Sequence, residues 1–184
     1  MTSILPFDEL NRFEATLRER FADGKLVKED EEDIIDEMLD LFLLAYAKGN
    51  SVTNANLSSD WMPTVDDVMK VVDERVAGKT WRERVEEYFS SGGSVDDLVR
   101  IAETETHRDA NTAALDTAKK AGAKTKTWVT MLDDKVRDTH SPLEGVSAPI
   151  DGEFHTWDGD HAQAPGLFTL AENNVNCRCE LIFS

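Results

Sequence analysis

Apolar residues recur at helical spacing along the first two thirds of the chain. Positions 7, 10, 13, 17 and 21 predict a helix over 7–22, and apolar positions between 34 and 46 predict a second helix over 28–48. Gly24 and Gly49 follow these helices and are predicted to end them. The polar stretch 50–60 has no such period and is predicted to be a loop.

Two shorter helices are predicted next. Thr64 is the expected N-cap of the first, which Gly78 would end. Thr80 opens the second, because Thr80-x-x-Glu83 matches a capping box. A serine and two glycines then break the pattern, so residues 1–93 form a predicted helical region.

A long helix is predicted from a Ser94 cap to Ala121, and its apolar stripe contains a charge. The stripe positions are Leu98, Ala102, Glu105, Asp109 and Ala113. A buried carboxylate needs a partner, and we expect Glu105 to pair bidentately with Arg137.

The period changes to two at 127–132, which predicts a strand. Asp133 is then the expected N-cap of a helical turn over 133–140. In such a turn Asp133, Arg137 and His140 are spaced i, i+4 and i+7, so they would lie on one face.

The rest of the chain is predicted to be loops, a hairpin and a returning strand. Asp151-Gly152 is typical of a tight hairpin turn. The final strand, 176–183, would pair with 126–132. We therefore predict an α+β protein, in which residues 94–184 form a second domain of a long helix on a small antiparallel sheet with a loop-rich C-terminal part.

The chain has 184 residues and a net charge of −17. Residues 1–100 contain 12 Lys and Arg against 23 Asp and Glu, and residues 101–184 contain 8 against 14. Such acidity disfavours unaided contact with DNA or anionic lipid, which needs clustered cations. A local basic patch is nevertheless conceivable at Lys119, Lys120, Lys124 and Lys126. We see no signal peptide and no apolar run long enough to span a membrane.

The two cysteines, Cys177 and Cys179, exclude a disulfide framework and favour a reducing compartment. On one face of a strand they would make a strained disulfide. A soft metal such as zinc could instead bind both thiols and His140. The fourth ligand would then be Asp133, His155 or His161. The alternative is that the two thiols simply fill a core face.

Asp133, Arg137 and His140 form either an acid–base set or a structural polar network. No obvious nucleophile accompanies them, which favours the network. We hypothesise that one polar cluster joins helix, turn and strand; its members would be Glu105, Asp133, Arg137, His140, Asn176, Cys177 and Cys179. His107 is expected on the surface or between helices, and His155 and His161 in exposed loops.

Several separated motifs follow one another over about 95–183. They are Thr104-Glu105 with Asn111, Lys126-x-Trp128, Asp133-x-x-Val136-Arg137-x-x-His140-x-x-Leu143-x-Gly145, Phe154, Pro165-Gly166 and Asn176-Cys177-Arg178-Cys179. In this order and spacing they resemble the Mu F-like family of phage head-morphogenesis, or minor capsid, proteins. Two positions depart from the family pattern: Glu103 replaces a frequent basic residue, and Leu167 replaces a common acidic one.

The resemblance implies a minor head protein rather than an enzyme. Such a protein would be made in the host cytoplasm, incorporated into the procapsid interior, and associated with the portal vertex in head assembly, DNA packaging or genome delivery. Its implied partner is the portal protein, with the major capsid or scaffolding protein as further partners. Residues 1–93 match no family motif and would form a docking module.

Two other functions are consistent with the sequence. One is a metal-dependent hydrolase or nuclease that uses Asp133 and His140, with His155 or His161. The other is a free-standing acidic effector that binds a basic protein.

Overall fold

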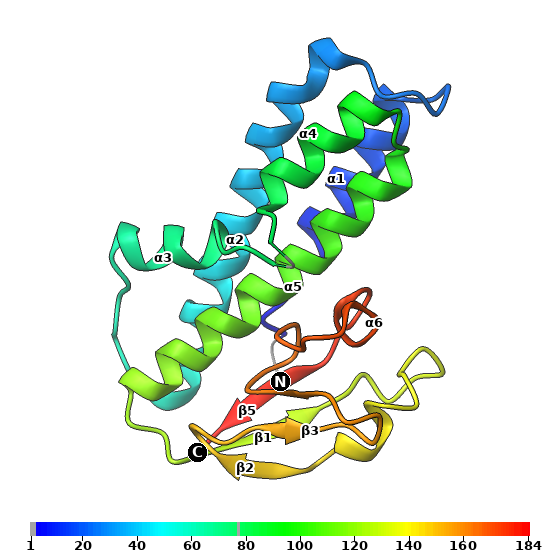
Figure 1. The fold of residues 1–184 in the computed structure, drawn as a ribbon. Helices are drawn as coiled ribbons and strands as arrows, with labels where there is room; N and C mark the ends of the chain where they lie inside the picture. The colour runs from blue at the N-terminus through cyan, green and yellow to red at the C-terminus, as the bar shows by residue number, and fades with distance from the viewer. Residues whose placement is uncertain (1–2, 77) are drawn as a thin grey trace.

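The computed structural model describes residues 3–76 and 78–184. It confirms the α+β class, with the helices gathered above a small sheet (Figure 1). The helices are α1 (Phe7–Arg20), η1 (Lys28–Asp30), α2 (Glu31–Leu57), α3 (Val65–Val72), α4 (Trp81–Ser91), α5 (Val95–Lys120), η2 (Ser141–Leu143) and α6 (Ala171–Asn174). The strands are β1 (Thr125–Val129), β2 (Ser147–Pro149), β3 (Phe154–His155), β4 (His161–Ala162) and β5 (Glu180–Phe183).

The helical bundle, formed by α1, α2, α4 and the first half of α5, surrounds the largest apolar core. Capping boxes begin α3, α4 and α5, since a Thr or Ser oxygen accepts the N3 amide while the N3 carboxylate accepts the N-cap amide. The predicted Thr80–Glu83 box is therefore confirmed. None of the helices in the described ranges is long and apolar enough to cross a membrane.

The second helix is longer than predicted, because Gly49 lies inside α2 and does not end it. A Cβ atom at this position would lie 2.2 Å from the carbonyl oxygen of Ala110 on α5. The glycine thus allows two long helices to approach closely, and the predicted loop at 50–60 is helical as far as Leu57. By contrast, α3 ends at Val72, well before Gly78; position 77 between them is outside the described residues.

Helix α5 connects the bundle to the sheet region (Figure 1). Its predicted stripe is confirmed, since all five side chains of that stripe are buried. Its first half contributes to the bundle core, while Leu115 in its second half belongs to the core of the sheet region. The helix therefore belongs structurally to both parts, and the predicted division at residue 94 stays a prediction.

The main sheet has the strand order β2-β1-β5 and is antiparallel throughout. Lys126 pairs with Phe183 and Val129 with Glu180, which confirms the predicted pairing over these four positions. Residues 130–132 and 176–179 lie outside the strands, against the prediction. The predicted hairpin at Asp151-Gly152 is wrong. A turn exists there, in which the Gly152 amide donates to the Pro149 carbonyl at 2.8 Å, but β2 pairs with β1 and β3 with β4.

Candidate functional site

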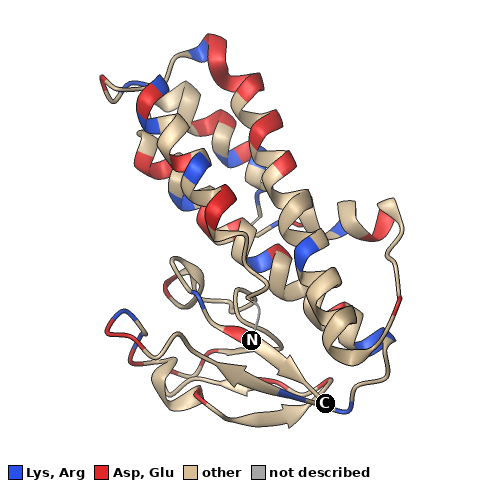
Figure 2. Cartoon of the chain, turned by 180° about the vertical axis from the view of Figure 1, so that it is seen from behind, with Lys and Arg blue, Asp and Glu red and all other residues tan. Residues whose placement is uncertain are grey.

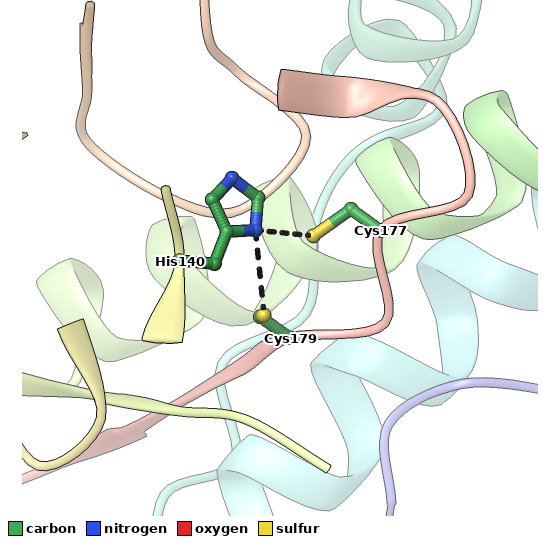
Figure 3. Close-up of side chains that lie close together, drawn as sticks. All are labelled: His140, Cys177 and Cys179. Atoms are coloured by element: carbon green, nitrogen blue, oxygen red, sulfur yellow. Dashed lines mark hydrogen bonds between the residues drawn. The ribbon is translucent and has the colours of Figure 1, made fainter. Parts of the chain in front are cut away.

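His140, Cys177 and Cys179 form a buried cluster within the sheet region (Figure 3). The Nδ1 atom of His140 lies 3.6 Å from the Cys177 sulfur and 3.7 Å from the Cys179 sulfur. The three donor atoms all lie within 4.8 Å of one another. His140 precedes the two cysteines by 37 and 39 positions in the chain. The fold nevertheless presents its nitrogen and the two sulfurs to a single point.

Local backbone geometry brings the two cysteines to the histidine. Asn176 has a φ of 56°, a left-handed conformation that asparagine tolerates better than most residues. The Cys177 amide then donates to the Asn174 carbonyl, which turns the chain before β5 begins. On the other side, the amide of His140 donates to the carbonyl of Arg137 in a tight turn.

Aromatic rings hold the His140 imidazole. It stacks on Phe168 with ring centroids 5.3 Å apart and meets Trp128 edge-on at 5.4 Å. Its Nε2 atom is buried and makes no hydrogen bond within the described part of the chain. Aromatic packing, together with the hydrogen bonds between Nδ1 and the two sulfurs, therefore fixes the ring with Nδ1 toward the cysteines.

The two thiols are free, and their sulfurs lie within 4.8 Å of each other. The neighbouring Cys179 thiol lowers the pKa of Cys177, and burial opposes the shift. The neighbouring Cys177 thiol raises the pKa of Cys179, and burial adds to the shift. Cys177 is therefore the thiol that ionises first.

The predicted fourth ligands lie elsewhere. The Asp133 carboxylate accepts two hydrogen bonds from Arg178, at 2.7 and 2.8 Å, on the exposed side of the cysteine segment. His155 and His161 stack on each other across the β3–β4 ribbon, with ring centroids 5.7 Å apart, and are exposed as predicted. What borders the three donors instead is a small cavity of about 10 Å³, lined also by Met131, Val136 and Arg137.

The predicted helical turn over 133–140 is wrong, and its polar residues do not share a face. Residues 133–140 form consecutive turns, and the strand before them ends at Val129. Leu132 has a left-handed φ of 54°, and the Asp133 side chain accepts from the Lys135 amide instead of capping a helix. The predicted acid–base set of Asp133, Arg137 and His140 is consequently not assembled.

Arg137 does not pair with Glu105 as predicted. It lines a cleft of about 620 Å³ between the N-terminal segment, α5 and the cysteine segment, together with Lys135, Arg178 and His107. His107 is buried, and its Nε2 atom lies 2.8 Å from the Cys179 carbonyl oxygen, so it contacts the cysteine segment and is not on the surface. Asn111 donates to the same oxygen at 3.3 Å, so α5 holds the backbone of the cysteine segment.

Glu105 belongs to a separate ionic cluster within the bundle. It pairs with Arg84 of α4 and, at 3.0 Å, with Arg108 one turn further along α5. Arg108 also contacts the fully buried Asp109 at 3.2 Å. Burial raises the pKa of Asp109 to about 7, although the charge of Arg108 opposes the shift. The hypothesis of one polar cluster is therefore wrong: the structure divides its members among the bundle, the surface and the thiol cluster.

Asp160 is a buried carboxylate in the sheet region that the sequence did not reveal. It accepts hydrogen bonds from the amides of His161, Thr169 and Leu170 and from the side chains of Thr169 and Asn173. Burial alone would raise its pKa, but these hydrogen bonds outweigh burial and lower it. The polar stretch 157–160 gave no signal beyond its composition, because every group that donates to the Asp160 carboxylate lies outside it.

The predicted lysine patch is also incomplete. Lys126 is fully buried, with its ammonium group 5.7 Å from the centre of the Phe154 ring. Burial lowers its pKa to about 8. Lys119 contacts Gln163 and Asp151, which leaves Lys120 and Lys124 as the more exposed members.

Comparison with known proteins gives one family and two partial relatives. The model of the family Phage Mu protein F like protein matches residues 49–182. The chain is 36% identical over 88 residues to NAD(+)--arginine ADP-ribosyltransferase EFV of Enterococcus faecalis, a match that covers 46% of this chain and 18% of that protein. It is 34% identical over 85 residues to Minor head protein GP7 of Bacillus phage SPP1, which covers 45% of this chain and 28% of the relative.

The chain thus spans less than a third of the length of either relative. No solved structure matches it. The family match begins inside α2, before the predicted division at residue 94, and includes all of α5 and the three residues of the thiol cluster. Because this match covers most of the chain and confirms the resemblance in the motifs, the chain belongs to the Phage Mu protein F like family.

Proposed function

We propose that this chain is a bacteriophage minor head protein that is incorporated into the procapsid and acts at the portal vertex. The observation that carries the proposal is the family match over residues 49–182. The relative named as a minor head protein supports it. Synthesis in the host cytoplasm, retention inside the virion, and a part in DNA packaging or genome delivery complete the proposal.

The arrangement of the polar residues favours a structural role over a catalytic one. Asp133 is engaged by Arg178, and His140 is buried among aromatic rings and thiols. Glu105 and Asp109 lie inside the bundle with Arg108. These groups connect elements of the fold, which suits a scaffold that must hold a loop-rich region in one conformation.

The bundle is the proposed docking surface. Acidic positions are distributed along its helices, away from the sheet (Figure 2). On α2, Asp33, Asp36 and Asp40 are exposed and are spaced to lie on one face. Such a face complements a basic surface on a portal protein or, as the next candidate, on a capsid or scaffolding protein. Direct DNA binding is disfavoured by the same charge.

The test is co-elution of the chain with its cognate portal protein in size-exclusion chromatography. We expect a complex at moderate salt that the triple variant Asp33→Lys, Asp36→Lys, Asp40→Lys weakens at least tenfold. A matched control, Asp134→Lys, Asp138→Lys, Glu172→Lys, makes the same charge change on exposed residues of the sheet region. It should bind like the parent.

Two results would overturn the portal assignment. One is a folded parent chain that does not co-elute with the portal protein at any salt concentration. The other is equal loss of binding in both triple variants, which would indicate a non-specific response to net charge.

An enzyme is the second candidate, because the longer of the two matched segments is shared with a protein named as an ADP-ribosyltransferase. The match covers only 18% of that protein, so the ADP-ribosyltransferase activity in its name does not have to belong to the matched segment. Incubation with NAD+ and an arginine-containing acceptor, followed by mass spectrometry, should show no transfer. A metal-dependent nuclease would be detected by plasmid cleavage that His140→Ala abolishes in a folded protein.

A further inference from the structure

We propose that His140, Cys177 and Cys179 bind one zinc ion, with a water molecule as the fourth ligand. The site would be a clamp that ties the segment before β5 to the turn before η2. The proposal does not depend on the proposed function, because such a clamp serves a head protein and an enzyme equally.

The spacing of the donor atoms matches tetrahedral zinc. With Zn–S of about 2.3 Å and Zn–N of about 2.0–2.1 Å, tetrahedral angles place nitrogen and sulfur roughly 3.6 Å apart. The observed separations from His140 Nδ1 are 3.6 Å to Cys177 and 3.7 Å to Cys179. Figure 3 shows Nδ1 facing both sulfurs from the opposite side of the cluster. The two nitrogen–sulfur separations therefore already match the spacing that a tetrahedral zinc ion requires.

The type of donor selects the metal. Two thiolates and one imidazole are soft or borderline ligands, which zinc accepts and which magnesium or calcium do not. All three residues are at most 5% exposed, so the ion would be shielded from competing solvent on most sides. The aromatic contacts of His140 with Phe168 and Trp128 hold Nδ1 in the binding orientation.

The fourth position has room for a solvent ligand. The metal-ligand cluster found in the described residues contains three side chains, and Asp133, His155 and His161 are held elsewhere. The adjoining cavity of about 10 Å³ is close to the size that one water molecule needs, roughly 10–15 Å³. A site with three protein ligands and one water follows from this geometry.

The clamp would stabilise the part of the fold that has the least regular structure. Between β1 and β5, the longest regular element is the four-residue α6. Zinc would link His140, in the first part of this stretch, to the two cysteines at its end, and so limit the freedom of the loops between them.

The first experiment is metal analysis of the full chain purified without chelator. We expect about one equivalent of zinc per chain. Replacement by cobalt should produce thiolate-to-cobalt charge-transfer absorption and the visible bands of a tetrahedral ion. Cys177→Ser and Cys179→Ser should each weaken zinc binding by more than roughly 100-fold, since both remove a ligand. His155→Ala should bind zinc like the parent.

The zinc affinities of the cysteine variants are informative only if the variants fold, so the parent chain supplies an independent measurement. Removal of zinc by a chelator should lower the melting temperature of the parent, and stoichiometric zinc should restore it. A folded parent with less than a tenth of an equivalent of zinc, and no cobalt–thiolate absorption after loading, would overturn the proposal. So would zinc that both folded serine variants retain.

Discussion

In the bundle, α1, α2, α4 and the first half of α5 enclose a continuous core of aliphatic and aromatic side chains. In the sheet region, strands of two to five residues support long loops, and the core consists largely of aromatic rings, small residues and two thiols. The bundle therefore depends on apolar burial along periodic helices. The sheet region depends much more on polar contacts between residues distant in sequence.

Buried charge also differs between the two regions. In the bundle, burial is the largest influence on the pKa of the Asp109 carboxylate and raises it. In the sheet region, the hydrogen bonds to the Asp160 carboxylate outweigh burial and lower its pKa. One buried acid therefore opposes folding when it ionises, and the other supports folding only when it is ionised. The difference shows that burial alone does not decide what a buried carboxylate does.

The largest expected effect separates the two cores. Trp128→Ala should lower the free energy of unfolding by about 3–5 kcal/mol, because the ring is fully buried against Phe154, Phe168 and His140. Trp81→Ala should cost a similar amount through loss of contact with Phe42 in the bundle. Hydrogen exchange should show protection lost mainly in β1 and β5 for the first variant and in α2 and α4 for the second.

The exposed Trp157 provides the control for this pair. Its side chain is 72% exposed, so Trp157→Ala should change stability by less than 1 kcal/mol or so. Equal loss of protection throughout the chain for both core variants would show that the two regions unfold as one unit through α5.

The next effect concerns Asp109 and pH. Its pKa is about 7 in the folded protein, above the ordinary value of about 3.9 for an aspartate, so the folded state holds the proton more tightly. The stabilising contribution of the neutral acid is present below about pH 4 and is lost as the pH rises through 7. The free energy of unfolding of Asp109→Asn, relative to that of the parent, should therefore increase by roughly 2–4 kcal/mol between pH 4 and pH 8. Denaturant unfolding at several pH values measures this, and a pH-independent difference would contradict it.

Asp160 should show the opposite dependence. Its lowered pKa means that the carboxylate stabilises the fold above about pH 4 and loses this contribution as the solution becomes more acidic. Asp160→Asn should cost about 2–3 kcal/mol at pH 7, since the amide replaces a charged acceptor of several hydrogen bonds. The difference from the parent should shrink on acidification. A difference that grows in acid would contradict this assignment.

The smallest expected effect is at the surface. Asp133→Asn removes the charge that pairs with Arg178, yet both partners are partly exposed, so the cost should be below about 1 kcal/mol and should fall in high salt. The neighbouring Asp134→Asn is a matched control, because Asp134 is exposed and has the same charge. If the free energy of unfolding fell by several kcal/mol in the Asp133 variant alone, Asp133 would be essential to the structure, against this prediction.

Sequence periodicity predicted the helices well where local signals agreed. The Thr80 capping box and the long helix from Ser94 were both confirmed, because a cap and its first turn lie within four residues. Gly49 was misread, since the reason for that glycine is the carbonyl of Ala110 on another helix. Asp133 resembled an N-cap, but Arg178 holds its carboxylate across the fold.

By itself, the sequence determined the fold class, the buried stripe of α5, the pairing of β1 with β5 and the family. These follow from periodicity and from motifs, which are properties of neighbouring residues or of their order. Only the tertiary structure decided the partners of the charges: Arg84 and Arg108 for Glu105, and Arg178 for Asp133. It also decided that His140 meets both thiols. The physical reason is that a side chain interacts with whatever the packed fold places within a few ångströms, and chain spacing does not encode that distance once the residues lie on different elements.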